Sequence, residues 1–122
     1  MNTQDGFTPA LPPLPFLPCL RGFVLYRRVL DAARIAYALE LTGDLRDQIV
    51  RASTSAVLNV AEGSGQPTVP AQRKYWGYAR GSVREVAAAT DLAAIRLGDR
   101  EDIRTLAGLL FEADRILRKL LA

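Results

Sequence analysis

Five polar residues recur at intervals of three or four between positions 48 and 62, so one face of a helix would carry Gln48, Arg51, Ser55, Asn59 and Glu62. Serine and asparagine disfavour an exposed helix interior, because their side chains compete for backbone hydrogen bonds. A partly buried, hydrogen-bonding role is therefore favoured over a purely solvated face. We refer to these five residues as the polar stripe.

The next helix along the chain supplies the expected partners of the polar stripe. An antiparallel hairpin that turns near Gln66 brings two pairs of segments together. It places Asn59 and Glu62 near Arg73, and it places Gln48 and Arg51 near Arg80 and Glu85. We therefore predict polar pairing between these two helices.

Basic residues on that next helix point to a second kind of chemistry, because they are interleaved with Tyr75, Trp76 and Tyr78. Arginine and lysine side chains that contact phosphates, and aromatic rings that stack on nucleobases, are typical of nucleic-acid binding. Trp76 fits the apolar seam of the helix, which leaves the two tyrosines for stacking. The candidate nucleic-acid-binding residues are Arg73, Lys74, Arg80 and Arg84.

Gly77 and Gly81 lie four residues apart within the same helix, although each costs about 1 kcal/mol relative to alanine there. Such a pair indicates that something approaches the backbone closely. We expect that a neighbouring helix makes this approach. The nearby basic residues leave a phosphate group as the alternative.

Catalytic arrangements are largely excluded. The chain has no histidine and one cysteine, Cys19, so neither a Ser-His nor a Cys-His pair can form. The carboxylates of the last helix do not share one face, and we predict no metal and no cofactor. The protein is therefore expected not to be an enzyme. A single cysteine is consistent with a reducing cytoplasm.

The pattern of apolar residues predicts four helices, over residues 20–40, 45–62, 69–97 and 100–121. Asp44, Thr68 and Asp99 are the expected N-caps of the last three. With hydrophobic residues at 49% and charged residues at 24%, the composition is that of a globular domain. We predict an all-α, antiparallel up-down-up-down four-helix bundle.

Residues 1–19 differ from the bundle, residues 20–122, because proline recurs at every third position from Pro9 to Pro18. This period is that of polyproline II and predicts an extended, proline-rich arm that either docks on folded protein or stays loose. The first helix carries two apolar stripes, which suggests a contact with the arm or with another subunit. No apolar run reaches the roughly 20 residues that span a bilayer, so no membrane contact is expected.

The segment from Gln48 to Gly63 resembles the signature of the four-helix bundle proteins encoded in intervening sequences of bacterial large-subunit rRNA genes. A second signature of this family is similar to the segment 79–82 with Glu85. The resemblance covers residues 20–121, with Ala56 and Val57 departing from the Ile-Pro common in relatives. Positions that match the family motifs are Arg51, Ser55, Asn59, Glu62 and Arg80.

This resemblance implies a homopentameric ring, and it extends to the accessory proteins of diversity-generating retroelements, which bind a reverse transcriptase and nucleic acid. The net charge of this chain is only +3, although 14 of its 16 basic residues are arginine, a residue suited to phosphates. We therefore expect a non-enzymatic, oligomeric binding protein that engages nucleic acid or a nucleic-acid-processing partner. The alternative is a purely structural or protein-interaction oligomer, with the arginine content reflecting a GC-rich genome.

Overall fold

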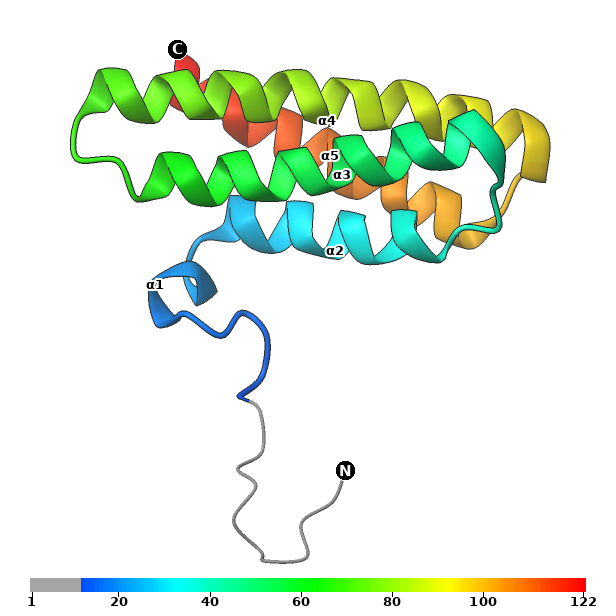
Figure 1. Ribbon diagram of the computed structural model, residues 1–122, viewed down its shortest axis with the longest axis horizontal. Coiled ribbons are helices and arrows are strands. Elements are labelled where there is room, and N and C mark those ends of the chain that lie inside the picture. Colours follow the sequence, from blue (N-terminus) through cyan, green and yellow to red (C-terminus); the bar gives the residue numbers. More distant parts are fainter. Residues whose placement is uncertain (1–11) are drawn as a thin grey trace, which may run out of the picture.

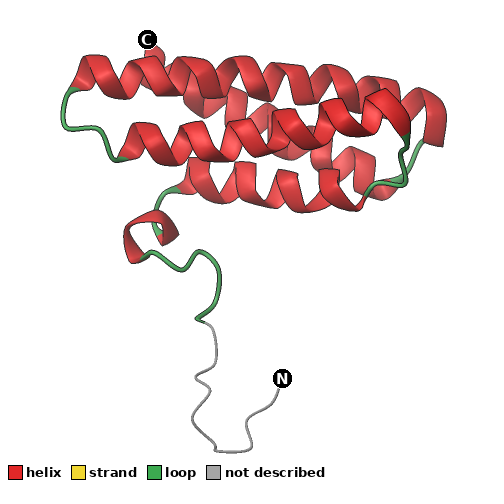
Figure 2. Cartoon of the chain, in the orientation of Figure 1, coloured by secondary structure: helices red, strands yellow, loops and turns green. Residues whose placement is uncertain are grey.

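The computed structural model describes residues 12–122, which form helices and loops (Figures 1 and 2). No strand occurs in this part of the chain. The predicted all-α bundle is therefore confirmed. Its helices are α1 (Pro18–Arg21), α2 (Val24–Ala38), α3 (Gly43–Ser64), α4 (Val69–Leu97) and α5 (Glu101–Leu121).

The four long helices lie lengthwise beside one another, and each connecting loop is at the opposite end of the bundle from the loop before it (Figure 1). Helix α3 packs between α2 and α4, and α5 also contacts both α2 and α4. Going around the bundle, the order is therefore α2, α3, α4, α5. The α2–α3 side is consequently opposite the α4–α5 side.

The core is formed by the apolar stripes that the sequence pattern predicts. All four long helices contribute side chains that are almost completely buried, among them Leu25, Ile49, Val83 and Leu106. The two buried hydroxyl side chains, on Ser53 and Thr90, each donate to the carbonyl four residues earlier. This bonding lets polar groups stay inside the bundle without an unpaired donor.

The first helix is interrupted where continuous helix was expected from Leu20. Phe23 has extended backbone angles, φ −89° and ψ 100°, and α2 begins only at Val24. The predicted extended arm is also wrong at its end, because Pro18 begins α1 at a position where its fixed φ suits a helix. The Nε of Arg21 donates to the Pro15 carbonyl at 2.8 Å and ties α1 back to the arm. The rest of the predicted arm, residues 1–11, lies outside the described residues.

One of the three expected N-caps is confirmed. The Oγ1 of Thr68 accepts a hydrogen bond from the backbone N–H of Ala71 at 3.3 Å. Thr42 instead occupies the N-cap position of α3, two residues earlier than expected and without a side-chain hydrogen bond, and Gly43 after it has a positive φ of 67°. Asp44 falls in the first turn, where its charge still suits the helix dipole.

The prediction that Asp99 is the N-cap of the last helix is also wrong. Arg100 occupies the N-cap position of α5, and Asp99 forms an ion pair with Arg104. The positive φ of Gly98 ends α4 and sets where the next helix can begin. None of the helices within residues 12–122 is long and apolar enough to cross a bilayer.

Candidate nucleic-acid interface

Within residues 12–122, Ser55 is the residue of the polar stripe whose side chain is hydrogen-bonded to α4. Its hydroxyl accepts a hydrogen bond from Ser82 on α4 at 2.9 Å, and Asn59 donates to the same oxygen at 3.1 Å. These three side chains are partly buried, as expected for the middle of the stripe. Gln48 and Arg51 are exposed, and the exposed Glu62 accepts a hydrogen bond from Gln66 at 2.9 Å. The stripe is therefore a short serine contact flanked by solvated residues.

The expected pairing of Arg73 and Arg80 with α3 is wrong, because both side chains turn to α5 instead. Arg80 Nε lies 3.1 Å from Asp114 Oδ1. The guanidinium of Arg73 donates to the carbonyls of Leu120, Leu121 and Ala122 at 3.3, 2.5 and 3.3 Å. The last carbonyls of a helix lack intrahelical partners, so a cation there is favourable. Helix α4 borders both α3 and α5, and the spacing of the arginines in the sequence does not show which of these two helices they contact.

Arg73→Ala is expected to lower the free energy of unfolding by about 1 kcal/mol, because the C-terminal turn of α5 loses its side-chain cap. Urea denaturation followed by circular dichroism measures this change. Lys74→Ala is the matched control, since the neighbouring Lys74 is exposed, lies over the ring of Tyr75 and forms no ion pair within residues 12–122. Equal effects of the two variants would contradict a capping role.

Gly77 and Gly81 are not sites of close helix packing within the chain, contrary to the expectation. Both are exposed, and a Cβ built on either would meet nothing within 4 Å. The glycine that permits a close approach is Gly63, where a Cβ would stand 2.5 Å from two atoms of the Trp76 ring. Trp76 Nε1 also donates to the Val60 carbonyl at 3.3 Å. In the sequence, Gly63 resembles a helix terminator, which conceals this role.

The exposed glycines lie close in sequence to an aromatic and basic cluster on α4. The rings of Tyr75 and Tyr78 meet edge to face with centroids 6.0 Å apart. Lys74 Nζ is 5.8 Å from the centroid of Tyr75, and 54% of Tyr78 is exposed. About half of Tyr78 is therefore accessible to a ligand.

Charge is divided unequally between the two ends of the bundle. The end with the α3–α4 loop and the C-terminus comprises residues 21–30, 54–66, 69–82 and 111–122 (Figure 1). This end, which we call the basic end, holds nine lysine and arginine residues against three acidic residues. The opposite half, residues 31–53 and 83–110, holds seven against nine. The modest net charge of the chain conceals this separation.

Three of the four predicted nucleic-acid-binding residues, Arg73, Lys74 and Arg80, lie in the basic end. Arg84 lies in the opposite half and is exposed. Sequence reasoning missed three basic residues of α5 that belong to the basic end: Arg115, Arg118 and Lys119. They could be grouped with α4 only once the register between the two helices was known.

The opposite half contains a local cluster of ion pairs around Arg100. Its guanidinium donates to both oxygens of Asp102 and to Glu40. The hydrogen bonds and charge of Asp102 raise the pKa of Arg100, which stays protonated in any case. Within residues 12–122, no three acidic or cysteine side chains gather so as to hold a metal ion.

The helices that carry these features are covered by one family description. The model of the 23S rRNA-intervening sequence protein family matches residues 25–119, which include all four long helices except their outermost residues. The chain belongs to this family. Membership accounts for the two sequence signatures on α3 and α4, and the family's name refers to the genetic location rather than to an activity.

A solved protein structure is similar to this chain and has the same fold. It is a protein of unknown function from the S23 ribosomal protein family of Bacteroides thetaiotaomicron, similar to this chain with a TM-score of 0.63 and 17% sequence identity. The similarity covers 81% of this chain and 93% of that protein. No curated protein matches the sequence. The family and the fold are therefore established.

Proposed function

We propose that this family member is a non-enzymatic binding protein that engages nucleic acid through its basic end, working as a homo-oligomer. The observation that carries this proposal is the excess of nine basic over three acidic residues at that end. Such a surface binds a polyphosphate backbone by displacing its counterions, so the affinity falls steeply as salt rises. The family resemblance to accessory proteins that bind a reverse transcriptase and nucleic acid agrees with this proposal.

Within the basic end, the residues differ in how free they are to meet a ligand. Arg73 holds the α5 carbonyls, and Arg80 and Arg118 both pair with Asp114. Lys74, Arg115 and Lys119 form no ion pair with another residue in the described part of the chain. We assign phosphate contact to these last three residues. Gly77 and Gly81, which add no side chain to the outer face of α4, let a backbone come near.

Fluorescence anisotropy with a structured RNA and with duplex DNA tests this function at low and moderate salt. The double variant Lys74→Glu with Arg115→Glu is expected to weaken binding at least tenfold and to reduce the salt slope by about one unit per lost phosphate contact. The matched control is Arg46→Glu with Arg96→Glu, an equal charge change outside the basic end, which we expect to alter the affinity less than about threefold because only close charges act strongly. Absence of binding by the unaltered protein at low salt would contradict the proposal.

A purely structural or protein-interaction oligomer is the second candidate, and exposed apolar side chains favour it. Ile95, Phe111 and Leu58 are 80%, 68% and 63% exposed on the outside of the bundle. Covering such exposed side chains with another protein would remove apolar surface from water, which favours association. Light scattering gives the molar mass in solution, and a monomer at all concentrations would exclude this candidate.

A further inference from the structure

A hollow of about 370 Å³ opens where α1 and the start of α2 meet the end of α3 and the first turns of α4. We call it the basic-end hollow, because five of its six residues belong to the basic end. Two aromatic rings line it together with small or uncharged polar groups; its residues are Cys19, Gly22, Phe23, Ser64, Gln72 and Trp76. Apolar walls, a few polar groups and a volume of about 300–1,000 Å³ are typical of small-molecule sites.

The break between α1 and α2 shapes the hollow. The extended backbone of Phe23 separates the two helices, and α1 lies off the line of α2 (Figure 1). Gly22 beside it leaves open space, since a Cβ there would meet nothing within 4 Å. On the opposite wall, Gly63 lets the Trp76 ring lie close against α3, where the Val60 carbonyl accepts a hydrogen bond from Nε1 at 3.3 Å. Backbone geometry therefore fixes both walls.

Phe23 and Trp76 supply rings on which a planar group can stack. Their centroids are 6.2 Å apart and their planes are inclined at 52°, so the two rings do not stack on each other. Both side chains are only partly buried. Aromatic rings of this kind hold the unpaired bases of single-stranded nucleic acids.

Ser64 and Gln72 supply hydrogen-bonding groups beside the rings. The Ser64 hydroxyl donates to the Ala61 carbonyl at 2.7 Å, which leaves its oxygen able to accept. The side-chain amide of Gln72 forms no hydrogen bond with another residue among 12–122. An amide both donates and accepts, as the edge of a nucleobase does.

Positive charge flanks the hollow. Arg21 donates to uncharged backbone carbonyls of the preceding segment, and Arg27 lies one helical turn beyond Phe23 and is exposed. Neither arginine forms an ion pair within residues 12–122. The acid nearest in sequence, Glu62, is two residues from Ser64 and therefore about 200° around α3 from it. The two arginines suit the phosphates on either side of a bound base.

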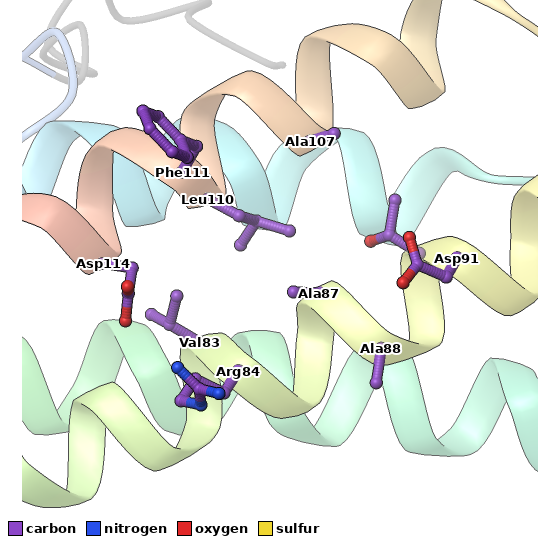
Figure 3. Close-up of a pocket in the computed structure, with 10 residues that line it drawn as sticks. Val83, Arg84, Ala87, Ala88, Asp91, Ala107, Leu110, Phe111 and Asp114 are labelled. Carbon is purple, nitrogen blue, oxygen red and sulfur yellow. The ribbon is translucent and has the colours of Figure 1, made fainter.

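The larger groove between α4 and α5, of about 450 Å³, is a poorer site for a polyanion (Figure 3). Small alanine side chains line much of it, and its charged residues are Arg84, Asp91 and Asp114. Asp91 forms no ion pair with another residue in the described part of the chain, so its charge repels phosphates. The basic-end hollow has no charged residue in its lining and has arginines beside it.

We propose that the basic-end hollow binds one unpaired nucleobase of a single-stranded nucleic acid. The base lies against Phe23 and Trp76, and its edge meets Gln72. The flanking phosphates lie near Arg21 and Arg27. This inference rests on the proposed nucleic-acid function and specifies its ligand, because the bases of a continuous duplex are paired and stacked and do not enter a hollow.

A short single strand and its abasic counterpart, which keeps the phosphates and lacks the bases, test the proposal. Fluorescence anisotropy at low salt is expected to show about tenfold tighter binding of the intact strand, because stacking is lost with the bases. Each strand is used as RNA and as DNA, which distinguishes these two sources of the base. Equal affinities for intact and abasic strands would overturn the base site and leave the nucleic-acid function standing, whereas binding of neither strand contradicts both.

Two variants assign the effect to the hollow. Gln72→Ala is expected to weaken binding of the intact strand about fivefold, because a hydrogen bond to the base edge is lost. Phe23→Leu keeps an apolar side chain without the ring and is expected to weaken it about tenfold. Neither change should alter the affinity for the abasic strand. Gln48→Ala is the matched control, an exposed glutamine at the other end of α3, and it should leave both affinities unchanged. Equal losses for both strands in Gln72→Ala and Phe23→Leu would contradict a base contact.

Two residues of the hollow report its occupancy in the unaltered protein. Trp76 is the chain's single tryptophan, and Cys19 is its single cysteine and is exposed. Saturation with the intact strand is expected to quench the tryptophan emission and to slow alkylation of Cys19 by iodoacetamide. The abasic strand at saturation should do neither. Unchanged emission and unchanged alkylation with the intact strand bound would place the base elsewhere and overturn the proposal.

Discussion

Leu106→Ala is expected to lower the free energy of unfolding by about 2–5 kcal/mol, the range found when a buried leucine is truncated. Leu106 is 0% exposed and lies on the inner face of α5. Removing its isobutyl group leaves a cavity that four packed helices can close only partly. Since small domains have about 5–15 kcal/mol of stability in total, the loss is a large part of it. Urea denaturation at one fixed protein concentration measures the change, because self-association would otherwise contribute.

Leu17→Ala is the matched control for Leu106→Ala, since it removes the same atoms from a side chain that is 56% exposed in the N-terminal segment. Its expected effect is within about 0.5 kcal/mol, as for most surface substitutions. Comparable losses for the two variants would mean that the core is not centred on the inward face of α5.

Gly63→Ala is expected to destabilise the protein by about 1–3 kcal/mol, although alanine is the better helix former. The new Cβ would stand 2.5 Å from the Cδ1 and Nε1 atoms of Trp76, so the indole must shift. That shift breaks the hydrogen bond from Trp76 to the Val60 carbonyl and disturbs the contact with Phe23. Denaturant unfolding gives the stability, and tryptophan fluorescence reports the displaced ring, because Trp76 is the chain's single tryptophan.

Gly81→Ala is the control for Gly63→Ala, and it is expected to change the stability in the opposite direction. A Cβ at Gly81 meets open space, so alanine should stabilise α4 by roughly 0.5–1 kcal/mol through helix propensity alone. A stabilising Gly63→Ala, or a Gly81→Ala as harmful as Gly63→Ala, would contradict the packing described here.

The sequence by itself determined the number of long helices, their approximate bounds and the core. A period of 3.6 residues assigns each apolar side chain to a helix face, and the core-facing residues of α3, from Leu45 to Val60, are buried as predicted. The N-cap at Thr68 also followed from local chemistry, because a cap depends on residues only two or three positions away. The signatures on α3 and α4 were sufficient to place the chain in its family.

Only the tertiary structure decided which neighbour each face meets. A polar residue at the edge of α4 can turn to α3 or to α5, and the spacing of Arg73 and Arg80 is the same in either case. Gly63 and Gly81 are the same residue type in the sequence. Only the position of the Trp76 ring shows that Gly63 is tightly packed and that Gly81 is not. The basic end depends on the register of four helices, since charges distant in sequence become one surface only when the helix ends align. Helix periodicity is a local property, whereas partner choice and register are set by the packing of the whole bundle.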